Sequence, residues 1–196
     1  KTHQRPLYGE FVTVNIFVLD ESPQVAAQDM CDKHVVKMIV ESAQMLSTAH
    51  RVLDGEQYIE LSANNRRIKR WKSPYELMED ILYKASFVGH PCTQWVMEND
   101  KNYYWLAEHA YALCKEYTRR YGKVHKTEDM ISLIRYRKPV NIPISDSITP
   151  FAQAMPEEYK NISAVEAYRS YYLGEKTYFA EWKNTETPSW YKEALV

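Results

Sequence analysis

The sequence from Ser22 to Gly55 repeats its apolar residues with the period of an α-helix, and no other feature constrains the fold as strongly. It opens with a helix-capping serine followed by a proline, Pro23, in the first turn. Its second part places these apolar residues on one wide arc of a helix: Val35, Met38, Ile39, Met45, Leu46, Ala49, Val52 and Leu53. We therefore expect two consecutive helices, with a break near Cys31 or Asp32, that bury one face in a core.

Capping signals and helical spacing recur further along the chain. The run Ser73-Pro74-Tyr75-Glu76 predicts a helix to about Ser86, and another helix follows the interruption "GHPCTQW". Residues 101–121 have the spacing of a long helix with Gly122 as its C-cap. Three further helices are predicted at 127–136, from Ser163 onward with Tyr168, Tyr172, Phe179 and Trp182 along it, and at the chain end "TPSWYKEAL".

Three segments lack this period. The segment "FVTVNIFVLD", residues 11–20, is rich in β-branched and aromatic residues, which predicts a short extended segment. Residues 56–72 are polar and predicted to be irregular. Residues 138–158 contain four prolines and predict a long ordered loop, which is often functional or bound to a partner. The fold class we expect is mainly α, with one short extended segment near the N-terminus.

Composition limits the class of protein. With 196 residues, 5 Gly, 16 Tyr and 5 Trp, the chain fits one domain of tightly packed helices. A net charge of -1 excludes a protein that coats nucleic acid by bulk charge, so any polyanion site must be local. Three cysteines do not form a secreted disulfide framework, and no run approaches the roughly 18 apolar residues of a membrane span. We expect a soluble cytoplasmic protein without a signal peptide.

A polar stripe lies opposite the apolar arc of the 32–55 region. Its members, His34, Lys37, Glu41, Gln44 and Thr48, share an arc of roughly 80° on a helical wheel. A solvated face is one interpretation, with Lys37 and Glu41 as an exposed pair at i,i+4. The other is a polar strip in a cleft, where an imidazole, an amine and a carboxylate form an acid/base and nucleophile set. The helical wheel leaves both open.

Two further patterns compete for a function. Cys31 with His34, and His90 with Cys92, supply the four ligands that a structural zinc site uses, although neither spacing is usual; we expect no metal and no cofactor. The segment "RRIKRWK" surrounds a tryptophan with cations, which suits contacts to phosphates and a stacked base. Its candidate DNA-binding residues are Arg66, Arg67, Lys69, Arg70 and Trp71.

Several blocks together resemble the pyrimidine-dimer DNA glycosylases of phages and their distant bacterial relatives. His34 and Glu41 have the separation of that family's histidine and catalytic glutamate. "KMIVESAQ", from Lys37 to Gln44, is similar to a K-x-x-V-E-x-x-Q pattern of the bacterial relatives. Gly89-His90-Pro91 followed by Trp95 resembles an N-H-P segment, and "PSWYK" resembles the family's C-terminal ending. The chain also looks like proteins of large tailed phages that begin "MNIFVLD", which implies an infected bacterial host.

This resemblance implies a compact helical domain that grips DNA, extrudes a nucleotide and cuts its glycosidic bond. In the family an N-terminal amine attacks C1′ of the sugar, and the glutamate, here Glu41, handles protons. The similarity starts near Val14, so residues 1–13 are expected to be an extension before a helical domain of residues 14–196. Arginines that the family carries beside the glutamate are replaced by Val40 and Gln44.

The expected site follows from these matches. Glu41 is the acid/base, Lys37 is the alternative amine, and His34 orients the sugar or phosphate. The basic segment 66–72, with Gln44, His90 and Trp95, contacts DNA, and Trp71 or Trp95 stacks on the extruded base. Two rivals are a catalytically silent module that binds DNA or protein, and an enzyme that modifies DNA bases by transfer. The oligomeric state and the base or lesion stay open.

Overall fold

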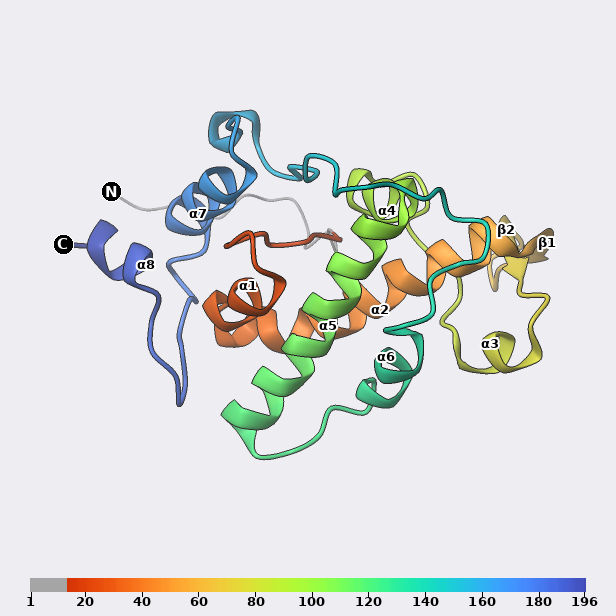
Figure 1. Cartoon of the computed structure of the whole chain (residues 1–196), viewed down its shortest axis with the longest axis horizontal. Helices are drawn as coiled ribbons and strands as arrows, with labels where there is room; N and C mark the ends of the chain where they lie inside the picture. Colours follow the sequence, from red (N-terminus) through yellow and green to blue (C-terminus); the bar gives the residue numbers. More distant parts are fainter. Residues whose placement is uncertain (1–13) are drawn as a thin grey trace.

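The computed structural model describes residues 14–196, and its fold is mainly helical, as predicted (Figure 1). The helices are α1 (Pro23–Asp29), α2 (Asp32–Asp54), α3 (Glu76–Ile81), α4 (Pro91–Glu98), α5 (Asp100–Tyr121), α6 (Glu128–Ile134), α7 (Ala164–Glu175) and α8 (Ser189–Ala194), with a short 3₁₀ helix, η1 (Glu157–Tyr159). Two strands, β1 (Glu56–Leu61) and β2 (Arg67–Lys72), pair with each other. No helix in this described part combines the length and apolar character needed to cross a lipid bilayer.

The two long helices form the centre of the fold. Helix α5 packs against α1, α2, α4 and α6, and it crosses in front of α2 in Figure 1. The apolar arc of α2 is buried as predicted: Val35, Ile39, Leu46 and Ala49 have no exposed surface. Burying such a face against a second helix removes a large apolar area from water, which is the main favourable contribution to this packing. Helix α2 therefore has one position fixed by the core.

The predicted break between α1 and α2 is confirmed, and a buried arginine fills it. The Arg120 guanidinium, at the end of α5, has no exposed surface. It donates to the carbonyls of Met30 (2.8 Å) and Gln28 (2.9 Å). It also donates to Asp32 Oδ1 (3.1 Å) and Glu116 Oε2 (3.0 Å). Backbone carbonyls left without partners by the break are thereby satisfied, and the start of α2 is attached to α5.

Three predicted caps are confirmed. Ser22 begins α1, and its Oγ accepts from the amide of Val25 (3.3 Å). Gly122 ends α5 with φ of 71°, the left-handed conformation that favours glycine. Ser163 begins α7, and its Oγ accepts from the amide of Glu166 (3.3 Å). The prediction that Phe179 and Trp182 lie on this helix is wrong, because α7 ends before both of them.

The predicted boundaries of α3 and α4 are also wrong. The Ser73 hydroxyl accepts from the amide of Tyr75 (3.2 Å) in a turn, and α3 begins only after it. Helix α4 starts inside the supposed interruption, at Pro91, with His90 as its N-cap. His90 Nδ1 accepts from the amide of Cys92 (3.1 Å), a capping role that the sequence analysis did not assign to a histidine.

Backbone bonds to α2 explain why the helix predicted to reach Ser86 stops at Ile81. The Arg51 side chain donates to the carbonyls of Tyr83 (2.6 Å) and Leu82 (3.0 Å). The amide of Tyr83 donates to the Ser47 hydroxyl (3.1 Å), and that of Ser86 donates to a second hydroxyl of α2. These contacts use the donors and acceptors that a longer α3 would need for its own hydrogen bonds.

Residues 56–72 form a hairpin, so the expectation of an irregular segment is wrong. The antiparallel register runs from Glu56 opposite Lys72 to Leu61 opposite Arg67. Asn65 has φ of 56° in the connecting loop, a conformation that asparagine tolerates better than most residues. The hairpin lies at one end of the molecule, beyond the C-terminus of α2 (Figure 1).

Two other segments without regular structure matter for the site. Residues 14–18 form no strand, although an extended segment was expected there, and they run buried between α2, α4 and α7. Residues 138–158 form a long ordered loop, as predicted. The predicted extension, residues 1–13, and the start of the predicted extended segment lie outside the described residues.

The joint between α2 and the hairpin gives a first prediction. A Cβ on Gly55 would lie 2.3 Å from the carbonyl oxygen of Arg51 and 2.9 Å from that of Lys72. Gly55→Ala should therefore lower the free energy of unfolding by about 1–3 kcal/mol in a denaturant titration. Gly89→Ala is the matched control, because nothing lies within 4 Å of its added Cβ. Equal stability of the two variants would contradict this close approach.

Candidate active site on helix α2

The polar stripe of α2 is covered by other parts of the chain. His34, Glu41 and Thr48 are 5%, 4% and 0% exposed, whereas Lys37 is exposed and Gln44 is half-buried. The interpretation of the stripe as a solvated face is therefore wrong for three of its members. Both faces of α2 are packed, the apolar arc against α5 and the stripe under shorter segments.

Glu41 is the unusual member of this stripe. Burial raises the pKa of its carboxyl to about 7, against smaller opposite effects of the Lys37 ammonium and of the nearby backbone N–H of Asn15, which does not meet the geometry of a hydrogen bond. The Lys37 Nζ lies 4.0 Å from Glu41 Oε1. Within the described residues, neither carboxylate oxygen has a hydrogen-bond partner. A buried carboxylate that titrates near neutral pH and has no partner is typical of a general acid or base.

Asn15 holds the first described residues beside Glu41, and the sequence analysis missed it. Its Oδ1 accepts from the Tyr168 hydroxyl (2.8 Å) and from the amide of Ile16 (2.8 Å), and its Nδ2 donates to the Ala154 carbonyl (2.9 Å). Two of these partners, Tyr168 on α7 and Ala154 on the long loop, lie far away in sequence. The only available signal was an asparagine inside an otherwise apolar segment, which is a position that needs several hydrogen bonds when buried.

His34 is a neutral, fixed ring next to this segment. It stacks on Phe17 with centroids 4.1 Å apart, and its Nδ1 shares a hydrogen bond of 2.5 Å with the Tyr172 hydroxyl. Burial, together with the ammonium groups of Lys176, Lys37 and Lys33, lowers its pKa to about 3. At neutral pH the ring can donate or accept one hydrogen bond, but it carries no charge.

Two of the three lysines near His34, Lys37 and Lys176, differ in their surroundings. A nucleophilic role for Lys37 assumed desolvation, yet its side chain is 45% exposed. Lys176 is half-buried directly after α7, with its Nζ 4.7 Å from the centre of the Tyr171 ring, and burial lowers its pKa. Lys176 was not predicted from the sequence; its place four residues after Tyr172, on the same side of the helix, was the available signal.

The two cysteine–histidine pairs have different surroundings. The Tyr172 hydroxyl lies 3.6 Å from Cys31 Sγ, whereas Cys92 Sγ lies 3.8 Å from Asn15 Oδ1. All three cysteines of the chain are buried and free. Among residues 14–196, no group of three or more His, Cys, Asp or Glu side chains could hold a metal ion.

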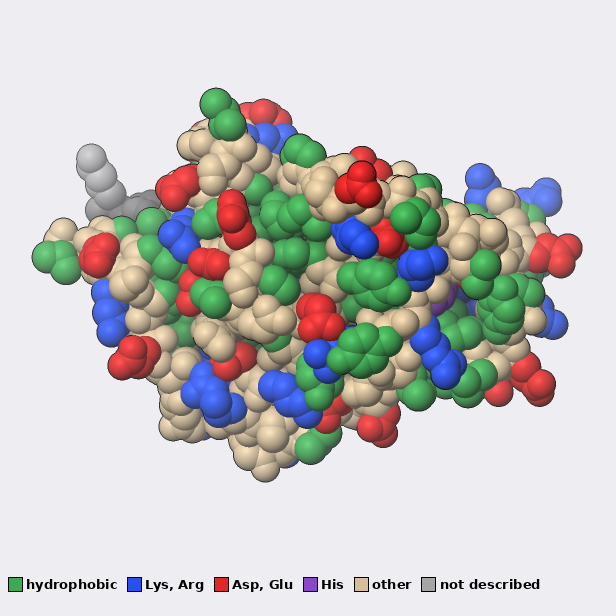
Figure 2. Space-filling view, viewed as in Figure 1, with side chains coloured by type: hydrophobic (Ala, Val, Ile, Leu, Met, Phe, Trp, Pro, Cys, Tyr) green, Lys and Arg blue, Asp and Glu red, His purple; other side chains and the backbone are tan. Residues whose placement is uncertain are grey.

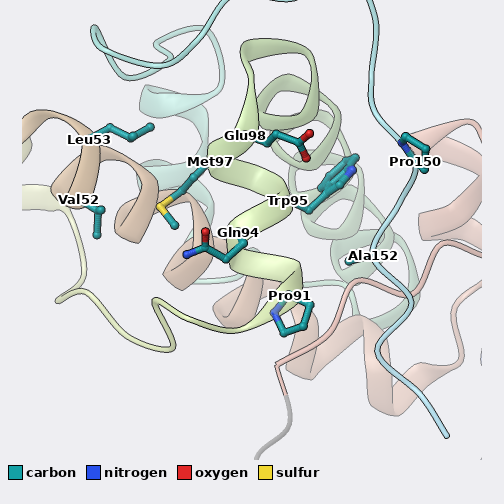
Figure 3. A pocket seen from close by; sticks show the side chains of 9 residues that line it. All are labelled: Val52, Leu53, Pro91, Gln94, Trp95, Met97, Glu98, Pro150 and Ala152. Carbon is teal, nitrogen blue, oxygen red and sulfur yellow. The ribbon is translucent and has the colours of Figure 1, made fainter. Parts of the chain in front are cut away.

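Trp95 is part of the core and offers little ring surface to a base. It is 4% exposed, its Nε1 donates to the Thr149 carbonyl (3.1 Å), and its ring packs 5.0 Å from that of Phe151. Figure 3 shows the groove of about 560 Å³ that it borders along α4. Among the described residues that line this groove, only Glu98 is titratable; it is exposed and accepts from the Thr149 hydroxyl (3.0 Å). This groove therefore lacks the acid/base character found at Glu41.

The basic segment lies on the hairpin, far from α7. Arg66, Arg67 and Lys69 are exposed and have no ion-pair partner among the described residues. Arg70 differs, because its Nε donates to Glu60 Oε2 (2.9 Å) and its charge is compensated. Basic side chains project at this end of the molecule in Figure 2. Three of the four predicted phosphate-binding cations are thus available to a ligand.

These features together define a helical protein with a buried glutamate of raised pKa and a basic hairpin. The family model described as pyrimidine dimer DNA glycosylase matches residues 14–130, more than half of the chain, and the protein belongs to this family. Membership implies a DNA glycosylase-type function in DNA repair, with DNA as the substrate. Neither the comparison with curated proteins nor that with solved structures found a match. The matched region includes the whole polar stripe and the hairpin but not α7.

The raised pKa of Glu41 predicts a pH-dependent stability. The pKa is 4.5 for an unperturbed glutamate and about 7 in the fold, so the proton is held more tightly in the folded chain. This contribution to stability is complete below about pH 4.5 and is lost as the pH rises through about 7. The side chain introduced by Glu41→Gln cannot ionise, so the variant does not lose this contribution as the pH rises. The difference in free energy of unfolding, variant minus parent, should therefore increase by on the order of 2 kcal/mol between these limits.

The measurement is a urea titration of parent and variant near pH 5 and near pH 8. The matched control is Glu116→Gln, because the buried Glu116 carboxylate accepts from Arg119 (2.7 Å) and Arg120 (3.0 Å). Removing that carboxylate should cost about 3 kcal/mol, since it leaves the buried Arg120 guanidinium with only one of its two carboxylate partners, Asp32. A difference between parent and Glu41→Gln that does not change with pH would contradict the buried ionisation.

Proposed function

We propose that this protein removes a base from a damaged nucleotide of DNA, with Glu41 as its general acid and base. The observation that carries the proposal is the state of that carboxyl: it is buried, its pKa is raised to about 7, and the described residues leave both oxygens without a partner. A silent binding module would lose stability by keeping such a group, because a buried unpaired carboxyl is destabilising.

The nucleophile we propose is an α-amine at Val14, present when the chain starts at that residue. The Asn15 amide lies close enough to the Glu41 carboxylate to lower its pKa, and Val14 is the next residue toward the N-terminus. The family match also begins at residue 14. Lys37 is the alternative amine, but its exposed side chain lacks the desolvation that activates a lysine.

In the proposed reaction C1′ loses its single bonds to the base and to O4′ and gains a double bond to nitrogen. The amine nitrogen attacks C1′, and the base leaves with the electrons of the glycosidic bond and takes up one of the two protons that the nitrogen loses. The C1′–O4′ bond then opens as the nitrogen lone pair forms the C1′=N bond, and Glu41 transfers the second of these protons to O4′. A carboxyl with a pKa of about 7 can both accept and donate this proton at neutral pH.

Other side chains would position the DNA. We propose that neutral His34 hydrogen-bonds the sugar or a phosphate, because its stacked ring is held rigidly. Gln44, half-buried one turn after Glu41, and His90, at the start of α4, would contact the strand beside the extruded nucleotide. Arg66, Arg67 and Lys69 would hold phosphates further along the duplex.

Glu41→Gln separates catalysis from folding. On duplex DNA with a pyrimidine dimer, the lesion that the family description suggests testing first, the variant should bind as the parent does. Its single-turnover rate of glycosidic-bond cleavage should fall about a hundredfold or more, because the proton donor is gone. The Glu41→Gln protein and its parent must start at the same residue, so that both carry the same α-amine. Turnover at the parental rate would overturn the acid/base assignment.

Borohydride trapping on abasic-site DNA identifies the amine. A chain starting at Val14 should give a stable reduced adduct, in higher yield than the full chain, because the imine between its α-amine and C1′ is reduced to an amine. Lys37→Ala and Lys176→Ala in that chain should trap as well as their parent. Loss of the adduct in Lys37→Ala alone would reassign the nucleophile to that lysine. No adduct with any variant would favour a binding module or a transferase that uses no imine.

The salt dependence of binding tests the hairpin. Arg66→Ala combined with Arg67→Ala should weaken binding to duplex DNA and lower the slope of log K against log salt by about one to two. Arg119→Ala is the matched control, because Arg119 is bonded to Glu116 (2.7 Å) at the far end of α5. An unchanged slope in the double variant would remove the hairpin from the DNA interface.

A further inference from the structure

The groove along α4 has no part in the chemistry proposed for Glu41. Its volume is about 560 Å³, and most of its lining is apolar (Figure 3). The walls come from the end of α2, from α4 and from the long loop, and they include Leu53, Trp95 and Pro150. Among the described lining residues, Glu98 alone carries a charge at neutral pH. The groove is therefore an apolar surface with one carboxylate.

The long loop presents an apolar ridge to solvent. Val140 and Ile144 are 63% and 69% exposed, and Pro143 between them is exposed as well. We call these three residues the loop ridge. Keeping several apolar side chains of one short segment in water is unfavourable, and such a surface is typical of a place where another molecule binds.

Hydrogen bonds to the two long helices hold the loop ridge in place. The amides of Val140 and Asn141 donate to the Asp54 carboxylate at the end of α2 (2.8 and 2.9 Å). The Pro143 carbonyl accepts from the amide of Asp100 at the start of α5 (2.9 Å). The loop ridge is thus formed in the single chain, so a partner would bind it without the entropic cost of ordering the loop.

The loop ridge and the groove lie next to each other on one surface. Asn141 Nδ2 donates to the carbonyl of Leu53 (3.3 Å), which is one of the residues that line the groove. The loop reaches the groove again after the ridge, where the Thr149 hydroxyl donates to Glu98 (3.0 Å) and Pro150 lines the wall. The backbone therefore passes along the rim of the groove and leaves the groove itself open.

The charges of the two surfaces are complementary. Arg137 and Lys138 precede the loop ridge, and residues 137–144 contain no carboxylate. Neither cation forms an ion pair within the described part of the chain, whereas the neighbouring Arg135 is bonded to Glu108 (2.8 Å). The groove carries the exposed carboxylate of Glu98. A ridge that is apolar and basic thus lies beside a groove that is apolar and acidic.

We propose that this surface binds a second copy of the chain, with each loop ridge in the groove of the other copy. A two-fold axis between the copies forms both contacts at once, because ridge and groove belong to the same surface. Val140 and Ile144 would fill the partner's groove, and Arg137 would lie near the partner's Glu98. This pairing explains why the loop ridge is exposed in the single chain and why its backbone is held firmly. The inference is independent of the chemistry proposed for Glu41.

Sedimentation velocity of the full chain tests the pairing. The parent should be a dimer at a chain concentration of about 100 μM and should dissociate on dilution. Ile144→Asp should raise the dissociation constant about thirtyfold or more, because it would bury an unpaired charge in the partner's groove. Ile162→Asp is the matched control, since Ile162 is fully exposed in another part of the chain, and it should leave the dimer intact. A monomeric parent, or equal effects of the two substitutions, would overturn the proposal.

Charge reversal tests which surfaces meet. Arg137→Glu and Glu98→Lys should each weaken dimerisation about tenfold, because each places like charges together in both contacts. An equimolar mixture of the two variants should recover the parental affinity as a heterodimer, since every loop ridge then meets a groove of opposite charge. A mixture that stays as weak as its components would contradict the pairing of ridge with groove. Glu41→Gln should dimerise like the parent, so that failure of the proposed chemistry and failure of this interface are separate results.

Discussion

The position of the whole site depends on the buried guanidinium of Arg120. A charged group without exposed surface is tolerated only when its donors are satisfied, and here four bonds reach the α1–α2 break and Glu116. Because a guanidinium has a rigid fork of donors, this arrangement fixes the direction in which α2 leaves the break. The polar stripe begins one turn later, with His34. Its orientation toward α7 and the first described residues is therefore set by α5.

A second arginine fixes the other end of α2. Arg51 donates to the carbonyls of Trp71 (2.8 Å), Leu82 (3.0 Å) and Tyr83 (2.6 Å), which belong to the hairpin and to the segment after α3. Helix α2 is thus attached at both ends to elements distant in sequence, and Glu41 lies between them. A rigid surrounding is what allows a buried carboxyl to persist without partners, because neither relaxation of the helix nor entry of a neighbouring donor can satisfy it.

The sequence predicted the elements that depend on a local helical period. It did not predict the features that are determined by contacts between residues distant in sequence. The apolar arc of α2 and the span of α5 follow from helical spacing, and Gly122 from the conformation that a C-cap requires. The hairpin was missed because its short strands are dominated by charges, so that the alternation of Ile68 and Trp71 with cations gave no clear period. Burial of the stripe was unpredictable for another reason: Asn15 and His34 are covered by α7, more than a hundred residues away.

The contrast between two buried glutamates makes the strongest case for chemistry at α2. Glu116 is 6% exposed and accepts three bonds from two arginines, so its burial is explained by the structure it stabilises. Glu41 is equally buried, faces one ammonium at 4.0 Å, and accepts no hydrogen bond from the described residues. Stability alone would favour an apolar residue at that position.

The family match spans both glutamates but ends before α7, so the helix that covers His34 lies outside the region that the family model describes. Helix α7 reaches the stripe through Tyr172, which bonds His34, and through Tyr168, which bonds Asn15. Both tyrosines have no exposed surface, so α7 acts on this site by fixing the positions of His34 and Asn15.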